Sequence, residues 1–534
     1  MVLRSAVLVL GFAYAGCGGG ATVNGGDGGA EGGLPDGGSP SCDVSFADHT
    51  VGLTSCRTGV TGGYVLYPAK HRPDVYLIDR LGRVVRHWSK SKYEPGQSCY
   101  LRENGNLVRA AAPPGGVNIG GGEGGRLEEY DWDDNLVWAF DFDAPEGMTH
   151  HDFTILPSGN LLMLAVEKKD ATAAAAVGFD TTKLQDGFVA PEMIIEVKQT
   201  GATSFEIVWQ WHVWDHLVQN TNANLTNYGD PRQYPGRLQV AYGGPAFWNH
   251  ANSIKYNPAL DQIIVSARSH NEFWVIDHST TTAEAAAHAG GKHGKGGDFL
   301  YRWGNPQMYG AGTSADQQLF QQHDAQWIDP GCPGAGNILV FNNGLSRPAG
   351  AYSSLDELVP PVAGDGSYPS LSPGQAWGPA GLTWKFVGAP PSSFYSPEIA
   401  GAQRLPSGNT LAFEGVTGRF FEVTTAGAIV WQYINPVGNA GPMSQYEKAP
   451  LDPKGHPQNA VFKGHWYAAD FAGFNGRDLT PGAVIEGSDT ACPTDNANYK
   501  CSSASACSAS GGSSEPHFGC ASGSVCCFKL VQGQ

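Results

Sequence analysis

Three histidines stand at the start of similar stretches of the chain, and they are the residues whose type and spacing could support chemistry. His151 opens HDFTILPSGN, His250 opens HANSIKYNPALDQ, and His323 opens HDAQWIDPGCPGAGN. In each stretch two apolar runs flank a turn sequence, which predicts a strand, a turn and a strand. Histidine accounts for only 16 of 534 residues, so three at one place in a recurring hairpin indicate a shared site.

Imidazole can attack as a nucleophile or exchange a proton near neutral pH. Arg268 ends the strand IIVSAR, 18 residues after His250. Its guanidinium is a planar fork of donors that suits an oxyanion such as sulfate, phosphate or carboxylate. His151, His250, His323 and Arg268 therefore predict a site that binds or transfers an anionic group.

Other residues near these four carry weaker signals. His456 lies nine residues before His465 in the poorest copy of the pattern, but a structural role is the better interpretation of this histidine. The remaining candidates are Arg347, Asn342 and Asn343 as further donors, and Trp248 and Trp327 as an aromatic lining that packing explains equally well.

The elements that must position these residues form a repeat over residues 60–470. Six strands carry a tryptophan near their end: VVRHW (Trp88), NLVW (Trp138), FEIVWQW (Trp209 and Trp211), FLYRW (Trp303), LTW (Trp384) and AIVW (Trp431). Six hairpin turns alternate with them, at Asn106, Asn160, Gln262, Asn337, Asn409 and, weakly, His465.

Repeated small antiparallel sheets predict an all-β fold, a six-bladed β-propeller, with the tryptophans packed between blades. Equivalent positions of successive blades point to the mouth of the central channel, so the histidines should converge there. The long gap at residues 183–244 predicts an insertion over one mouth. Within it His212 and His216 lie four apart; we interpret them as loop histidines and expect no metal.

Composition supports an exported protein of short strands and many turns. The chain has 73 Gly and 35 Pro, and a formal net charge of −17 with no basic run. This charge argues against binding to nucleic acid and against binding to an anionic membrane surface.

Residues 1–17 resemble a secretory signal whose Ala-Gly-Cys end favours lipidation of Cys17, although Tyr14 departs from the usual aliphatic residue. Residues 18–41, with eleven Gly, predict a disordered linker. The expected location is the periplasm, or the outer membrane or cell surface through a lipid anchor.

Eleven cysteines agree with an oxidising compartment. If Cys17 is lipidated, an even number remains for pairing. Six lie within residues 488–534, where they predict a small disulfide-rich C-terminal module with three bridges; fifteen pairings are possible.

At this point the chain resembles a known family. The elements HDFTILPSGN, HANSI, the strand ending at Arg268, QQHDAQW and FNNG are similar to those of the bacterial arylsulfate sulfotransferases. The resemblance covers about residues 60–470 and implies transfer of a sulfuryl group from aryl sulfates to phenols without a cofactor. It implies His323 as nucleophile, Arg268 as the sulfuryl-binding arginine, and His250 and His151 as further catalytic residues. The shared His-Asp pairs, at residues 151–152 and 323–324, favour His151 over the adjacent His150.

Two other functions fit parts of the pattern. A propeller that binds a ligand or partner without turnover is the main alternative. A quinoprotein dehydrogenase would need calcium-binding carboxylates around a stacking site, and the sequence places no acidic cluster for one. Members of the family carry an N-terminal β-domain that is linked to dimerisation. In this sequence the predicted propeller begins almost directly after the linker, so we make no prediction about the oligomeric state.

Overall fold

The computed structural model describes residues 42–115, 121–142, 147–184, 186–242, 248–488, 491–521 and 523–531. The expected signal segment (1–17) and linker (18–41) lie outside the described residues. Within these ranges no helix is long and apolar enough to cross a bilayer.

Six sheets of four or more antiparallel strands make up the body of the described chain. In order of hydrogen-bonded neighbours, the first sheet is β32 (His465–Tyr467), β3 (Tyr64–Pro68), β4 (Val75–Asp79) and β5 (Val84–Trp88). The second is β6 (Glu94–Leu101), β7 (Leu107–Ala112), β8 (Arg126–Tyr130) and β9 (Leu136–Asp141). The third is β10 (Gly147–Ile155), β11 (Leu161–Glu167), β14 (Glu192–Gln199) and β15 (Phe205–His212).

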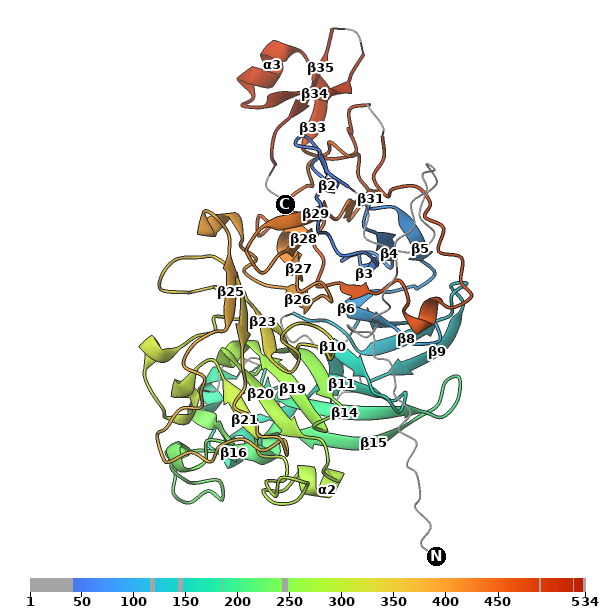
Figure 1. The fold of residues 1–534 in the computed structure, drawn as a ribbon. Coiled ribbons are helices and arrows are strands. Elements are labelled where there is room, and N and C mark those ends of the chain that lie inside the picture. Colours follow the sequence, from blue (N-terminus) through green and yellow to red (C-terminus); the bar gives the residue numbers. More distant parts are fainter. Residues whose placement is uncertain are drawn as a thin grey trace, which may run out of the picture.

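The remaining sheets continue in chain order. The fourth is β18 (Ala251–Asn257), β19 (Gln262–Ala267), β20 (Glu272–Asp277) and β21 (Tyr301–Trp303). The fifth is β22 (His323–Trp327), β23 (Ile338–Asn342), β24 (Ser354–Leu358) and β25 (Trp384–Val387). The sixth is β26 (Ala400–Arg404), β27 (Thr410–Glu414), β28 (Arg419–Val423), β29 (Ile429–Ile434), β2 (Gly52–Cys56) and β1 (Val44–Ser45). Figure 1 shows the sheets following one another around a centre, so that orange strands return beside the first blue ones.

The fold is therefore all-β and propeller-like, and both ends of the chain close it. The late strand β32 pairs with β3 in the first sheet, and the early strand β2 pairs with β29 in the sixth. Because segments far apart in sequence share these two sheets, opening the ring would break backbone hydrogen bonds in both.

The tryptophan strands lie at or near the outer side of their sheets, and several indoles bind the neighbouring sheet. Trp88 Nε1 donates to the carbonyl oxygen of Asp131 at 2.9 Å. Trp431 Nε1 donates to that of Arg80 at 2.7 Å, which joins the sixth sheet to the first. Large buried rings with a satisfied N–H stabilise such contacts, so packing between sheets explains these tryptophans.

The recurring Gly-Asn turns have a structural cause as well. Gly105, Gly159, Gly336 and Gly408 all have φ between 84° and 90°, which favours glycine. The next residue, an asparagine, donates from its amide to a glutamate on the third strand of its sheet. The pairs are Asn106 with Glu129, Asn160 with Glu196, Asn337 with Glu357 and Asn409 with Glu422.

Two expectations about the elements were wrong. The sequence FKGHWY forms no hairpin; it leads into β32, and the corresponding hairpin of that sheet is β3–β4. Residues 183–244 are not wholly an insertion, because β14 and β15 within them belong to the third sheet. The sequence predicts the strand with Trp209 and Trp211, but its long separation from the hairpin turn at Asn160 hides the fact that both belong to one sheet.

Short helices and two-stranded sheets lie outside the six larger sheets. They are the helices α1 (Ala171–Ala176) and α2 (Thr282–Ala285) and the paired strands β12 (Lys169–Asp170) with β13 (Phe188–Val189), β16 (Leu217–Val218) with β17 (Leu238–Gln239), and β30 (Val437–Gly438) with β31 (Gly441–Pro442). Short 3₁₀ turns are η1 (Thr181–Lys183), η2 (Val213–His216), η3 (Pro231–Gln233), η4 (Val240–Tyr242), η5 (Arg268–His270), η6 (Pro306–Tyr309), η7 (Ser314–Asp316), η8 (Pro391–Ser393), η9 (Gly415–Thr417) and η10 (Ala472–Phe474).

The C-terminal residues project from the body as a separate small sheet (Figure 1). It contains β33 (Tyr499–Ser502), α3 (Ala504–Ala509), β34 (Ser513–Gly519) and β35 (Val525–Phe528). Three disulfides hold it, Cys492–Cys526, Cys501–Cys520 and Cys507–Cys527. A fourth, Cys42–Cys56, joins a residue two positions before β1 to the last residue of β2. Cys99 is a buried thiol and forms no disulfide.

Candidate active site

The innermost strands of three sheets bend where the predicted histidines lie. The pairing of β10 with β11 shifts between Thr149 and Phe153, and His151 within that shift has φ of 48°. His250, just before β18, has φ of 49°, and Asp324 in β22 has φ of 53°. Positive φ is uncommon outside glycine and concentrates at functional sites, where the surrounding structure holds it.

These bends bring the predicted side chains together. The ring centroids of His151 and His250 are 5.1 Å apart. The ring of Phe462 lies 5.7 Å from that of His151 and 6.2 Å from that of His323. The structure thus places three histidines from three sheets around one point, as the repeat predicted.

His323 has a defined tautomer. Asn343 donates its amide N–H to the carbonyl oxygen of Ser396 at 2.8 Å, so its Oδ1 faces His323 Nδ1, also at 2.8 Å. An amide oxygen only accepts, so His323 donates Nδ1–H and its Nε2 carries a lone pair. Burial, and then the nearby charge of Arg268, lower the pKa of His323 from 6.5 to about 3. The ring is a neutral imidazole at neutral pH.

Arg268 supplies positive charge at the same point. It follows β19 at the start of η5, and its backbone N–H donates to the carbonyl oxygen of His250 at 3.1 Å. Its guanidinium forms no hydrogen bond or ion pair with any residue that the structure describes. Burial lowers the pKa of Arg268, and the charge of Glu398 raises it; an arginine side chain nevertheless stays protonated in proteins at neutral pH. A partly exposed guanidinium that faces no acceptor among the described residues is ready for an oxyanion.

His151 and His250 are also held neutral. Burial lowers the pKa of His151 well below 6.5, and a proton on His250 or His150 would lower it further. Burial and then Arg268 have the same effect on the pKa of His250. Imidazoles beside a fixed cation and beside one another cannot all be protonated, so the site offers neutral rings and one arginine.

The aspartates of the two His-Asp pairs do not face the histidine site. Lys463 Nζ donates to Asp152 Oδ2 and to Asp324 Oδ1, each at 2.8 Å. Asp152 also accepts from Tyr100 Oη at 2.8 Å and from the backbone N–H of Ile254 at 3.0 Å. Burial alone would lower the pKa of Lys463, but the two aspartates raise it well above its ordinary value. This buried bridge ties β10 to β22 directly beneath His151 and His323.

A sequence profile of the family described as Arylsulfotransferase (ASST) matches residues 60–357, more than half of the chain. The chain belongs to the arylsulfotransferase family. No curated protein sequence matches it.

Solved structures similar to this chain share little sequence with it. A protein of unknown function from Bacteroides caccae has 10% identity over 76% of this chain and 98% of its own, with a TM-score of 0.38. A streptogramin B lyase has 10% identity over 76% and 86%, with a TM-score of 0.34. The Dos1 propeller has 10% identity over 68% and 67%, with a TM-score of 0.30.

Of the weaker candidates of this arylsulfotransferase, Asn343 contacts the site, and His456, Arg347 and Asn342 bind other residues. His456 faces the carboxylates of Glu398 and Asp452 at 3.7 and 3.9 Å, in agreement with a structural role. Arg347 lies over the rings of Phe320 and Tyr352. Of the two asparagines, Asn343 supports His323, whereas Asn342 binds Gln318 and Asp356.

The two tryptophans expected near the arylsulfotransferase site are not in the histidine cluster. Trp248 is buried against Phe179 and His270. Trp327 lines a cavity of about 460 Å³ near the hairpin turns, together with Tyr100 and Lys255. The Lys463 bridge separates this cavity from the histidines along the same strands.

Sequence reasoning missed Lys463, His150 and Glu192. Lys463 stands in FKGHWY, the poorest copy of the repeat, so pattern matching discounted it. A signal was present nonetheless, because two aspartates expected to be buried require a cation. His150 was set aside as a neighbour of His151, and Glu192 lies in the stretch interpreted as an insertion.

Proposed function

We propose that this chain is a six-bladed propeller enzyme that transfers a sulfuryl group from an aryl sulfate ester to a phenol through sulfohistidine at His323. One observation carries this proposal. The Nε2 lone pair of neutral His323 lies within the field of Arg268, whose guanidinium has no acceptor among the described residues. A nucleophile beside an unfilled oxyanion site is the arrangement that group transfer requires.

The first half-reaction forms the covalent intermediate. Nε2 of His323 attacks the sulfur atom, the bond from sulfur to the aryl oxygen breaks, and its electron pair leaves on the phenolate. The Nδ1 proton remains directed at Asn343, which holds the ring in its attacking orientation. Arg268 and His250 bind the sulfuryl oxygens while negative charge moves to the leaving group.

The second half-reaction regenerates the enzyme. The oxygen of an acceptor phenol attacks the sulfur atom, the nitrogen–sulfur bond breaks, and the electron pair returns to His323 Nε2. A phenol has an ordinary pKa of about 10, so a positioned base must take its proton. The proton lost by the acceptor balances the one gained by the released phenolate, and no cofactor takes part.

The site is covered over His151 and His323, whereas His250 and Arg268 are partly exposed. His151 is 2% exposed and His323 is 1% exposed. Residues 121–125 are part of the cover, because a Cβ on Gly122 would lie 1.8 Å from Cε1 of His151. We expect this segment to open for the aryl sulfate and then exclude water, which would otherwise hydrolyse the intermediate.

We further propose that the enzyme is extracytoplasmic and anchored by lipid at Cys17. Its disulfides suit an oxidising compartment. Intact-mass measurement of the protein from the membrane fraction should show a chain that begins at Cys17 and carries acyl mass. A mature chain that begins elsewhere without that mass would contradict the anchor.

A chromogenic aryl sulfate tests the activity. Release of 4-nitrophenol from 4-nitrophenyl sulfate should depend on added phenol, with phenyl sulfate as the second product. Release without acceptor at the same rate would indicate a sulfatase, and no release would favour a propeller that only binds.

Rapid quench tests the intermediate. Enzyme mixed with aryl sulfate and no acceptor should give one equivalent of released phenol and one sulfated peptide containing His323, if the peptides are kept mildly alkaline. A sulfated peptide without His323 would overturn the assignment of the nucleophile.

A further inference from the structure

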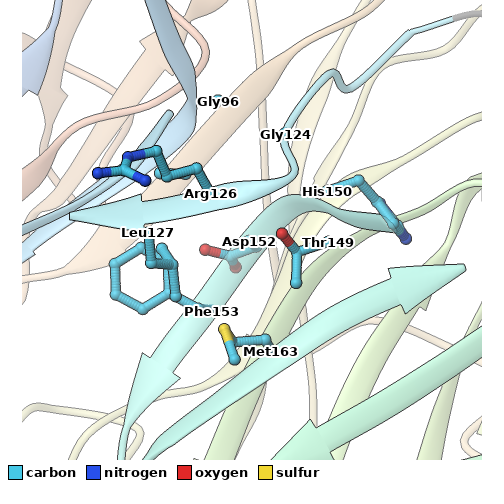
Figure 2. Close-up of a pocket in the computed structure, with 10 residues that line it drawn as sticks. Gly96, Gly124, Arg126, Leu127, Thr149, His150, Asp152, Phe153 and Met163 are labelled. Carbon is cyan, nitrogen blue, oxygen red and sulfur yellow. The ribbon is translucent and has the colours of Figure 1, made fainter. Parts of the chain in front are cut away.

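His150 and Glu192 form a buried chain of hydrogen bonds that ends on His151. His150 Nε2 lies 2.8 Å from Glu192 Oε2, and His150 Nδ1 lies 2.9 Å from His151 Nδ1. His150 is 3% exposed and Glu192 is 1% exposed. In Figure 2 the His150 ring extends away from the apolar group of Leu127, Phe153 and Met163, which line a small pocket beside it.

Glu192 is fixed from both sides. Its second oxygen, Oε1, accepts the backbone N–H of Ala251 at 2.7 Å, and its own backbone N–H donates to Asn249 Oδ1 at 3.0 Å. Both contacts flank His250 on the next sheet. The carboxylate therefore joins the strand that carries His150 and His151 to the segment that carries His250.

With Glu192 ionised and His150 neutral, the chain of contacts sets where the protons lie. An ionised carboxylate only accepts hydrogen bonds, so His150 donates Nε2–H to Glu192. A neutral His150 then has a lone pair on Nδ1, and the hydrogen in the contact between the two rings belongs to His151 Nδ1. This leaves the lone pair of His151 on Nε2, the ring nitrogen on the side opposite His150.

We propose that Glu192 and His150 are positioning residues that hold His151 in this tautomer, so that its Nε2 accepts the proton of the acceptor phenol. This inference rests on the proposed function and assigns the base that the second half-reaction needs. As the phenol O–H bond breaks, the proton moves to His151 Nε2 while the phenol oxygen attacks sulfur. Glu192 stabilises the positive charge that appears on the two imidazoles, as a carboxylate does behind a catalytic histidine.

The same proton completes the cycle. His151 gives it to the phenolate released from the next donor molecule, so that no net proton is gained or lost by the enzyme. Acceptors that are already ionised, and donors whose phenolate is a weak base, do not need this transfer. The contribution of the chain should therefore depend on the acidity of the substrate.

The variants Glu192→Gln and His150→Gln test this dependence, with acceptors of different acidity. Sulfated enzyme is formed with 4-methylumbelliferyl sulfate and mixed at mildly alkaline pH with phenol, or with 4-nitrophenol, which is ionised there. Transfer to phenol should fall about 10²-fold, the scale of a lost general base. Transfer to 4-nitrophenol, and the burst from 4-nitrophenyl sulfate, should change by less than about threefold because neither needs a proton transfer.

His212→Gln is the matched control. His212 Nδ1 lies 3.2 Å from Glu167 Oε1, so it forms a second His–Glu pair in the same sheet, outside the histidine cluster. This variant should leave transfer to both acceptors unchanged. Thermal unfolding of all variants identifies any that fail to fold, and either test variant alone decides the question.

An equal loss for both acceptors would show that Glu192 and His150 only support the fold, and no loss for phenol would show that they do not position a base; either result overturns the inference. The native enzyme alone gives a further test. The rate of sulfuryl transfer to phenol should show a solvent deuterium isotope effect, and the rate of transfer to 4-nitrophenol should show none. Absence of the isotope effect with phenol would also overturn the inference. Failure of the proposed function is distinct from either result, because the native enzyme would then give no sulfated His323.

Discussion

Histidines at the two ends of the sheets have opposite charge states. At the start of the strands, His323 faces Asn343 and the charge of Arg268, and burial lowers its pKa to about 3. Near the hairpin turns, His278 faces Glu196 at 3.0 Å and Asp261 at 2.8 Å. Burial would lower the pKa of His278, but the two carboxylates raise it to about 9.

We call the side of the sheets near the hairpin turns, where His278 lies, the turn end, and the side where His323 begins β22 the strand-start end. The difference in charge state shows that the two ends have different roles. At the turn end each of the four glutamates that bind a turn asparagine also faces a cation. In the second, third, fifth and sixth sheets these cations are Arg102, His278, Arg404 and Arg80. At the strand-start end the cation Arg268 has no carboxylate partner among the residues that the structure describes, and the imidazoles are neutral. Paired charges hold the fold together, and unpaired charge beside neutral nitrogen is what chemistry on an anion needs.

The largest effect expected from this comparison is on activity. His323→Ala should abolish both the burst and transfer, by about 10⁴-fold or more, because loss of a nucleophile removes the covalent route. His278→Ala should retain most activity, since its ring serves the turn end. Stopped-flow release of 4-nitrophenol measures both, and an active His323→Ala enzyme would remove the contrast.

Replacement of the unpartnered cation should be the next largest effect. Arg268→Lys keeps a positive charge but loses the planar fork, and loss of a preorganised donor costs about 10²–10³-fold in rate. Arg404→Lys, which alters a cation already paired with Glu357, should change stability more than rate. Steady-state kinetics with thermal unfolding separates the two; equal rate losses would contradict the distinction.

Lys463 should affect stability more than any residue of the histidine site. Lys463→Met leaves Asp152 and Asp324 buried without their cation, and breaking a buried ion pair costs about 3–5 kcal/mol. The triple variant with Asp152→Asn and Asp324→Asn should recover part of that loss. Urea unfolding measures both, and a single variant as stable as the native protein would show that the bridge contributes little.

The two pKa values predict opposite pH dependence of stability. His278 has a raised pKa, so its contribution is full below 6.5 and is lost as pH rises to about 9. His323 has a lowered pKa, so its contribution is full above 6.5 and is lost as pH falls to about 3. Unfolding at a series of pH values should show that His278→Gln flattens only the alkaline slope and His323→Gln only the acidic one. The reverse assignment would be incompatible with the contacts described.

The smallest effect on activity should come from removal of residues 488–534. The tail touches the body through the stacked rings of His517 and Tyr446 and the ion pair of Lys448 with Glu515, far along the chain from every histidine of the site. The shortened enzyme should keep its kcat within about threefold, as for a change outside the reacting groups. A large loss would mean that the tail contributes to the site.

The sequence predicted the repeat well because each sheet uses the same local rules. Apolar alternation, Gly-Asn turns and terminal tryptophans recur, and each has a local cause such as the positive φ of Gly159. Prediction was wrong where strands from distant parts of the chain share a sheet. The residues 465–467 resemble half of a hairpin, yet their partner β3 lies about four hundred residues earlier, and no local pattern reveals such a pair.

The sequence by itself determined the fold class, the family and the positions of His151, His250, His323 and Arg268, because residue type and spacing repeat with the strands. Only the tertiary structure decided which of these groups are neutral and which nitrogen carries each lone pair. Those properties depend on burial and on partners such as Asn343 and Glu192, which reach the site from other strands and sheets. The chain order does not encode such contacts locally, so they appear only when the sheets close around one centre.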